Sequence, residues 1–92
     1  MEFIYDREKD RLLRSTRAIG FQEAIEAIES GNVLADFPHP NRNKYANQRV
    51  MVVEIDGYAY VVPYLSDNGV LVLKTVYPSR KFKHLIEGAT DE

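Results

Sequence analysis

The fold is decided by residues 49–65, RVMVVEIDGYAYVVPYL. Two runs of alternating apolar residues flank Asp56-Gly57, a pair that is typical of a two-residue type I′ turn. The stretch therefore predicts a β-hairpin, and its register follows from the turn. The pairs that close its two ends are Ile55 with Tyr58, and Arg49 with Tyr64.

A second turn, SDNG at residues 66–69, predicts a further antiparallel strand over residues 70–77. The three strands then form a meander. A two-residue turn would place Lys74 beside Pro63, and a three-residue turn would place it beside Val62, on the other face. The sequence leaves this choice open.

Upstream of the hairpin, the pattern begins with a short strand over residues 3–5, followed by a charged helix over residues 7–14 that Asp6 can cap. Gly20 interrupts this helical region. Residues 21–28 then have apolar side chains at i, i+3, i+4 and i+7, which is typical of an amphipathic helix. These two helices predict a helical hairpin.

Gly31 is the expected end of the second helix, and residues 33–37 predict a strand. Residues 38–48 have no period and much turn chemistry, so they predict a long loop. Loops of this length in compact domains often carry function, although a merely tolerated surface loop remains the alternative.

At the other end, Pro78 suits the first turn of a helix over residues 79–87 that Gly88 would stop, with residues 88–92 frayed. The predicted order is β-α-α-β-β-β-β-α. The chain should therefore form one α+β domain over residues 1–92, in which helices cover one side of a mostly antiparallel sheet.

The composition excludes several classes of protein. The 92 residues are 45% hydrophobic and include no cysteine and only two histidines, so disulfides, thiolate metal sites and cofactor motifs are not expected. The sequence has neither a signal-peptide pattern nor an apolar run of about 20 residues. We expect a cytoplasmic protein that has no membrane segment and needs no cofactor or metal.

Charge is unevenly distributed along the chain. Residues 1–36 carry five Lys/Arg and eight Asp/Glu (−3), residues 37–86 carry seven and three (+4), and residues 87–92 add −3, which gives the net −2. A positive second half on a weakly acidic chain favours local RNA binding over indiscriminate binding. A solvated surface is the alternative interpretation.

The residues with the most chemistry follow the apolar strand, where hydroxyl and cationic side chains surround the predicted start of the last helix. Cations at this junction could neutralise a phosphate, while the RNA's own 2′-hydroxyl acts as nucleophile and a histidine or tyrosine moves protons. The candidate catalytic residues are Lys74, Tyr77, Arg80, Lys81 and His84. The candidate RNA-binding residues are Arg42, Lys44, Arg49, Tyr64, Ser79 and Lys83.

Each candidate also has a structural interpretation. Arg80, Lys81 and Lys83 are equally consistent with the exposed face of a helix that buries Phe82 and Leu85. Alternating tyrosines at positions 58, 60 and 64 resemble a base-stacking platform, but aromatic residues at strand spacing are more often half-buried core. We therefore do not predict them to form an RNA-binding stripe.

Three segments of the chain resemble the BrnT-like toxins of the RelE/ParE-like superfamily. These are FIYD at residues 3–6 with Lys9, IGFQEA at residues 19–24, and the meander that ends before a basic helix. The resemblance covers nearly the whole chain and is strongest at its start. BrnT-like chains usually have arginines just after the last strand, where this chain has Tyr77-Pro78, and they are usually strongly basic.

The resemblance implies a RelE/ParE-like domain and a toxin of a type II toxin–antitoxin module. Such toxins are metal-independent endoribonucleases that cut mRNA, on the ribosome or free of it, and so inhibit translation. The matching basic residues here are Lys74, Arg80 and Lys81, with Arg49 as a further contributor. The implied partner is an antitoxin with a helical or disordered segment that covers the basic cleft and through which oligomers could form.

Two other functions stay open from the sequence. The chain could be a non-catalytic binding module that pairs with proteins through its charged first helix, as the negative net charge favours. It could also inhibit a protein target, as the gyrase-directed branch of the superfamily does.

Overall fold

The predicted hairpin is the centre of the structure, a computed structural model that describes residues 1–90, with side chains described through residue 86. Strands β3 (Arg49–Ile55) and β4 (Tyr58–Asp67) pair in the predicted register, and both ends of the hairpin close on the predicted pairs. Asp56 and Gly57 have φ values of 53° and 79°, the positive values that a type I′ turn requires. The hairpin prediction is confirmed.

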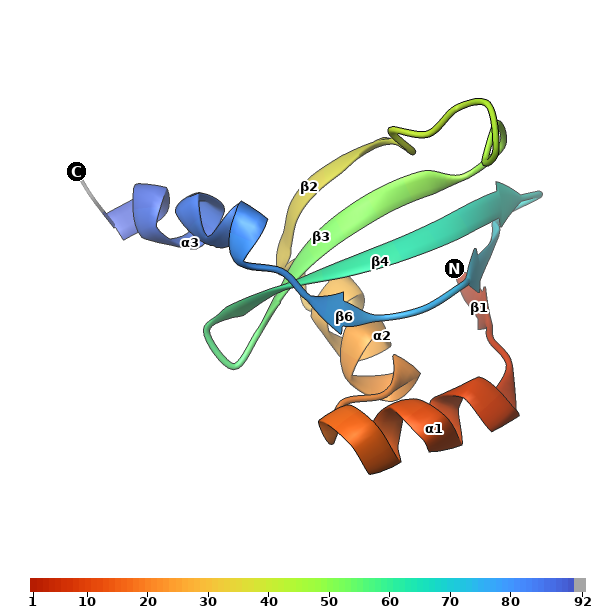
Figure 1. Cartoon of the computed structure of the whole chain (residues 1–92), viewed down its shortest axis with the longest axis horizontal. Coiled ribbons are helices and arrows are strands. Elements are labelled where there is room, and N and C mark those ends of the chain that lie inside the picture. Colours follow the sequence, from red (N-terminus) through yellow and green to blue (C-terminus); the bar gives the residue numbers. More distant parts are fainter. Residues whose placement is uncertain (91–92) are drawn as a thin grey trace.

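The sheet extends from this hairpin on both sides, in the order β1-β5-β4-β3-β2 (Figure 1). Strand β2 (Val33–Pro38) pairs antiparallel with β3 on one side, and β5 (Val70–Leu73) pairs antiparallel with β4 on the other. Strand β1 (Glu2–Ile4) pairs parallel with β5. The chain is thus a small α+β domain with a mixed sheet in which antiparallel pairs predominate.

The second turn contains two residues. Asp67 pairs with Val70, and between them Asn68 and Gly69 have φ values of 51° and 83°. This turn determines the position of Lys74, whose N–H donates to the Pro63 carbonyl over 2.8 Å. The question that the sequence left open is therefore settled in favour of Pro63.

The predicted strand over residues 70–77 is wrong, because it is broken into two. After β5 the chain leaves the sheet for three residues and returns as β6 (Tyr77–Pro78), which pairs with β4 at Tyr60 and Val61. The partner of Leu73 is Tyr64 and that of Tyr77 is Val61, so the register shifts by one residue in between. Leu73 and Val76 are both in the core, a spacing of three that a continuous strand, with its period of two, cannot provide.

The last helix also differs from its prediction. Pro78 is in a strand, and Ser79 is extended and donates its N–H to the Ala59 carbonyl over 3.0 Å, which continues the sheet pairing. A 3₁₀ turn, η1 (Arg80–Phe82), and then α3 (Lys83–Thr90) follow. The predicted start at Pro78 is therefore wrong. The predicted stop at Gly88 is also wrong, because a helix tolerates an internal glycine at a cost of only about 1 kcal/mol. Of the predicted frayed tail, residues 88–90 belong to α3 and residues 91–92 lie outside the described part.

The first two helices are as predicted, although the first is longer. In α1 (Arg7–Arg17), the Asp6 carboxylate caps the start by accepting the N–H groups of Glu8 and Lys9. Helix α2 (Phe21–Glu29) follows Gly20, which has no side chain with which to cap it. Asp10 of α1 supplies this cap, because its carboxylate accepts the Phe21 N–H over 2.8 Å.

An ion-pair bridge reinforces this cap. The Arg14 guanidinium lies 3.1 Å from the Asp10 carboxylate and 3.2 Å from that of Glu23 in α2. Desolvation raises the pKa of Glu23, but hydrogen bonds from the Gly20 N–H and from Arg14 lower it by a larger amount. The pKa of Glu23 therefore lies below its ordinary value. The two helices are thus locked together at the turn between them.

Both faces of the sheet are covered, whereas helices were predicted on one side only. On one face, side chains of α1 and α2 pack with Met51, Val53 and Val62 to form the main core. On the opposite face, the Phe82 ring lies 5.9 Å from that of Phe37. Phe37 pairs with buried Val50, so η1 and the start of α3 cover this second face. Figure 1 shows α3 beginning at the sheet and extending beyond it.

Candidate functional site

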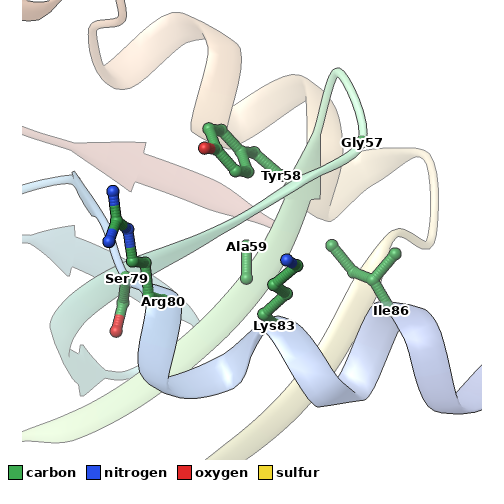
Figure 2. A pocket seen from close by; sticks show the side chains of 7 residues that line it. All are labelled: Gly57, Tyr58, Ala59, Ser79, Arg80, Lys83 and Ile86. Atoms are coloured by element: carbon green, nitrogen blue, oxygen red, sulfur yellow. The ribbon is translucent and has the colours of Figure 1, made fainter.

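The described surface is hollowed where β4 faces η1 and α3 (Figure 2). We call this hollow of about 310 Å³ the basic pocket. It combines two cations with an exposed aromatic ring, and none of the described residues that line it is acidic. The lining residues are Gly57, Tyr58, Ala59, Ser79, Arg80, Lys83 and Ile86.

The aromatic ring of the basic pocket is that of Tyr58, the first residue of β4 after the type I′ turn. The residue is 57% exposed. On its protein side the ring meets Tyr60 edge-on, with the centroids 6.5 Å apart. A ring that is held on one side and open on the other can stack with a flat ligand such as a nucleobase.

The two cations come from consecutive elements, Arg80 from η1 and Lys83 from α3. Residues three apart in a helical segment lie on the same side, and Figure 2 shows both cationic groups on the side that faces Tyr58. The Ser79 N–H bond to Ala59 fixes the start of this segment against β4. Guanidinium and ammonium groups that share a pocket are suited to a phosphate.

A second hollow adjoins the basic pocket at Ser79, which lines both. This hollow of about 150 Å³, the aromatic pocket, lies on the second face of the sheet between β6, η1 and the loop after β2. Apolar side chains form its walls, and polar side chains complete the lining. The lining residues are Phe37, His39, Pro40, Val50, Val61, Tyr77, Ser79, Lys81 and Phe82.

The five predicted catalytic residues do not share one pocket. Arg80 lines the basic pocket, and Tyr77 and Lys81 line the aromatic pocket. His84 is exposed on α3, with Nδ1 3.2 Å from the Lys81 carbonyl oxygen. Lys74 is separate from all of these.

The position of Lys74 follows from its backbone bond to Pro63. Pro63 is four residues along β4 from Ala59, which is roughly 13 Å at the rise of a strand. Lys74 instead lines a hollow with Lys9 and Asp6 at the start of α1. The predicted cationic cluster is therefore divided between two regions.

The predicted RNA-binding residues are also divided. Ser79 and Lys83 line the basic pocket. Arg42 and Lys44 are exposed in the long loop, where the Lys44 ammonium lies 5.3 Å from the centroid of the Tyr45 ring. The remaining two, Arg49 and Tyr64, lie at the far end of the hairpin from Tyr58.

Arg49 and Tyr64 belong to a hydrogen-bonded cluster around Asp36 of β2. The Tyr64 phenol oxygen is 2.8 and 2.7 Å from the two Asp36 carboxylate oxygens, and Arg49 Nε is 3.1 Å from one of them. Tyr64 is only 4% exposed. This cluster connects β2, β3 and β4, and Asp36 neutralises the charge that Arg49 would offer to RNA.

The cluster gives a prediction about alkaline stability. Desolvation, and then the hydrogen bond to Asp36, raises the pKa of Tyr64 above its ordinary value. A raised pKa in the folded state means that stability is fully present below about pH 10, the pKa of an unfolded tyrosine, and is lost as the pH rises through the folded-state pKa. We expect urea titrations between about pH 9 and 11 to show a steeper loss for the wild-type chain than for Tyr64→Phe. Parallel slopes would contradict this assignment.

Tyr58 and His39 line these pockets with side chains that can contact a ligand, although neither is a predicted site residue. The strand spacing of Tyr58, Tyr60 and Tyr64 favours half-buried core, but Tyr58 comes directly after a two-residue turn and is exposed at the end of its strand. For His39, the sequence indicates only a place in the long loop. The backbone N–H of His39 donates to the Gln48 carbonyl over 3.0 Å, and this bond holds the start of the loop beside the sheet.

Among the residues that the structure describes, no group of three or more histidine, aspartate or glutamate side chains could hold a metal ion. The described helices are too short or too polar to cross a membrane. Neither a protein-family model nor a curated protein matches the chain.

Proposed function

We propose that this chain is the toxin of a type II toxin–antitoxin module and that it binds and cleaves single-stranded RNA around the basic pocket. The observation that carries the proposal is that Arg80, Lys83 and the open ring of Tyr58 line one pocket. Phosphate-binding cations beside a stacking surface are the usual means of holding single-stranded RNA. The resemblance to BrnT-like toxins supports cleavage as the outcome.

The reaction needs no group beyond the RNA and these side chains. The 2′-oxygen attacks the adjacent phosphorus, the P–O5′ bond breaks, and the products carry a 2′,3′-cyclic phosphate and a 5′-hydroxyl. A base takes the 2′-hydroxyl proton and an acid donates one to the leaving 5′-oxygen, so the number of protons is unchanged. Arg80 and Lys83, the two cations of the basic pocket, would stabilise the charge on the phosphorane-like transition state.

The proton-transfer candidates are His84 and Tyr77. If Nδ1 of His84 bonds to the Lys81 carbonyl oxygen, it must donate, because a carbonyl only accepts. The neutral ring then has a lone pair on Nε2 that can accept a proton, whereas a tyrosine hydroxyl is a weak base. Because Lys74 lies apart from Arg80, the proposal does not depend on it.

The test is growth of a bacterial host during controlled induction of the chain, with total RNA examined at early times. Wild-type induction should arrest growth and fragment RNA, and Arg80→Ala, Lys83→Ala should do neither. A matched control, Arg7→Ala, Arg11→Ala, removes two charges from α1 and should remain toxic. Toxicity that persists in the first variant would overturn the assigned site, and healthy growth of the wild type would overturn the toxin function.

Binding gives an independent prediction for the same pocket. Each phosphate contact on single-stranded RNA contributes about 0.7 to the slope of log affinity against log salt. Removing two contacts with Arg80→Ala, Lys83→Ala should therefore reduce that slope by about 1.4 and weaken binding of all sequences similarly. Fluorescence anisotropy with a 2′-O-methyl oligonucleotide, which lacks the nucleophile, measures this without cleavage. An unchanged slope would exclude the basic pocket as the phosphate site.

A partner follows from the same proposal. A cognate antitoxin would place a helical or disordered segment over the basic pocket and neutralise it. Co-expression with the neighbouring gene should restore growth. Purification of the two proteins as one complex would identify that gene product as the partner.

One observation favours the second candidate, a non-catalytic module that pairs with other proteins. Helix α1 exposes Leu12 among charged residues, with 61% of that residue accessible, and the net charge of the chain is −2. A harmless module should express freely and leave RNA intact. In that case Leu12→Ser should abolish partner binding, whereas the basic-pocket variants should not.

A further inference from the structure

The aromatic pocket has features that the toxin proposal does not use. Its walls include the rings of Phe37 and Phe82, tilted by 36° with centroids 5.9 Å apart, together with buried Val50 and Val61. Burying a phosphate against such apolar walls would cost desolvation energy. A nucleobase is flat and apolar on its faces, so it suits these walls better than an anion does.

His39, which lines this pocket, is held as a hydrogen-bond donor. Its Nδ1 accepts the Asn41 N–H over 3.1 Å, and its ring lies 4.4 Å from the Tyr45 ring. Because Nδ1 is an acceptor, the proton of the neutral ring is on Nε2. Within the described residues, Nε2 has no protein partner, so its N–H is available to a ligand.

Lys81 adds a second donor group to the same pocket. Its ammonium lies 5.7 Å from the centroid of the Phe82 ring and has three N–H donors and no acceptor. A base edge that offers a carbonyl oxygen matches these donors, whereas an exocyclic amino group meets them donor to donor. Uracil and guanine have such carbonyl edges, and lysine commonly contacts guanine in this way.

We propose that the aromatic pocket binds one unpaired nucleobase of the RNA, a uracil or guanine, with its carbonyl edge toward His39 and Lys81. This inference rests on the proposed function in that the ligand is RNA. Ser79 lines both pockets, so a nucleotide with its base in the aromatic pocket can have a neighbouring phosphate in the basic pocket. The aromatic pocket would then select sequence, and the basic pocket would supply affinity.

The test uses three 2′-O-methyl heptanucleotides that cannot be cleaved. All have adenines at six positions, and the central position is uracil, adenine or an abasic sugar. By fluorescence anisotropy, the wild-type chain should bind the uracil oligomer about tenfold more tightly than the abasic one, within the range of stacking on aromatic side chains. It should prefer uracil to adenine by about fivefold, which corresponds to one hydrogen bond.

Two variants of His39 distinguish its role as a hydrogen-bond donor from its contribution to the shape of the pocket. His39→Gln keeps an N–H donor and should keep most of the preference for uracil, whereas His39→Ala should lose it while the affinity for the abasic oligomer stays unchanged. Circular dichroism of both variants establishes that each is folded. If Phe82→Leu also loses the uracil-over-abasic difference, the pocket wall is the stacking surface.

The outcomes distinguish this inference from the toxin proposal. Equal affinity of the wild type for all three oligomers overturns the base pocket and leaves backbone-only binding intact. A uracil preference that is undiminished in both His39→Ala and Lys81→Ala also overturns it, because the base is then read elsewhere. Failure to bind any oligomer overturns RNA binding and, with it, the function on which this inference rests.

Discussion

Replacing Phe21 with alanine is expected to lower the free energy of unfolding by about 3 to 5 kcal/mol, the range for large aromatic-to-alanine changes in cores. Phe21 is 0% exposed and stacks on Tyr5 with ring centroids 4.8 Å apart. It begins α2 and belongs to the core between the helices and the sheet. In a chain of 92 residues, this loss should lower Tm by roughly 12 °C or more.

The matched control removes an aromatic ring from the surface. Tyr58→Ala deletes a side chain of similar size that is mostly exposed, so it should cost less than about 1 kcal/mol. For RNA binding we expect the opposite ranking, with a larger loss of affinity in Tyr58→Ala than in Phe21→Ala. Urea denaturation of the two variants measures the difference in stability. Equal losses would contradict the placement of Phe21 in the core.

Gly20→Ala is expected to have the second largest effect on stability, a loss of about 2 kcal/mol, the size of a hydrogen bond to a charged group. A methyl group at Gly20 would overlap the Asp10 carboxylate and lie 2.9 Å from Arg14 Nε. Asp10 cannot move freely, because it accepts the Phe21 N–H and pairs with Arg14. The substitution therefore removes the cap of α2 and loosens the ion-pair bridge.

A double-mutant cycle isolates this mechanism. In an Asp10→Ala background the overlap with the carboxylate is absent, so Gly20→Ala should cost much less than in the wild-type chain. Thermal unfolding of the wild type, the two single variants and the double variant gives the coupling free energy between Gly20 and Asp10. If Gly20→Ala costs the same in both backgrounds, the loss does not come from the Asp10 cap.

The elements with strong local signals could be predicted from the sequence. The Asp56-Gly57 turn determines the β3–β4 register, and Asp6 marks the start of α1. The break between β5 and β6 has no such local signal. It arises because Leu73 and Val76 both enter the core. In addition, the Val76 carbonyl accepts a hydrogen bond from the guanidinium of Arg17, which lies in α1, 59 residues earlier in the chain. Propensities within the strand contain no information about that contact.

The functional site could be predicted less well than the fold. The cationic character of the strand-to-helix junction was evident, and Arg80 and Lys83 do share a pocket. The exclusion of Lys74 could not be foreseen, because it depends on the length of the second turn, which the sequence leaves open. The presence of His39 in the aromatic pocket depends on a loop whose path is set by contacts with Gln48 and Tyr45.

The parallel pairing of β1 with β5 determines the order in which the chain can mature during synthesis. Glu2 pairs with Val70, 68 positions later (70 − 2), so β1 leaves the ribosome long before its partner exists. The hairpin needs only neighbouring residues and can form first, and closing the long loop between β1 and β5 must be a late step. A nascent chain that is released before Leu73 would therefore lack a complete sheet.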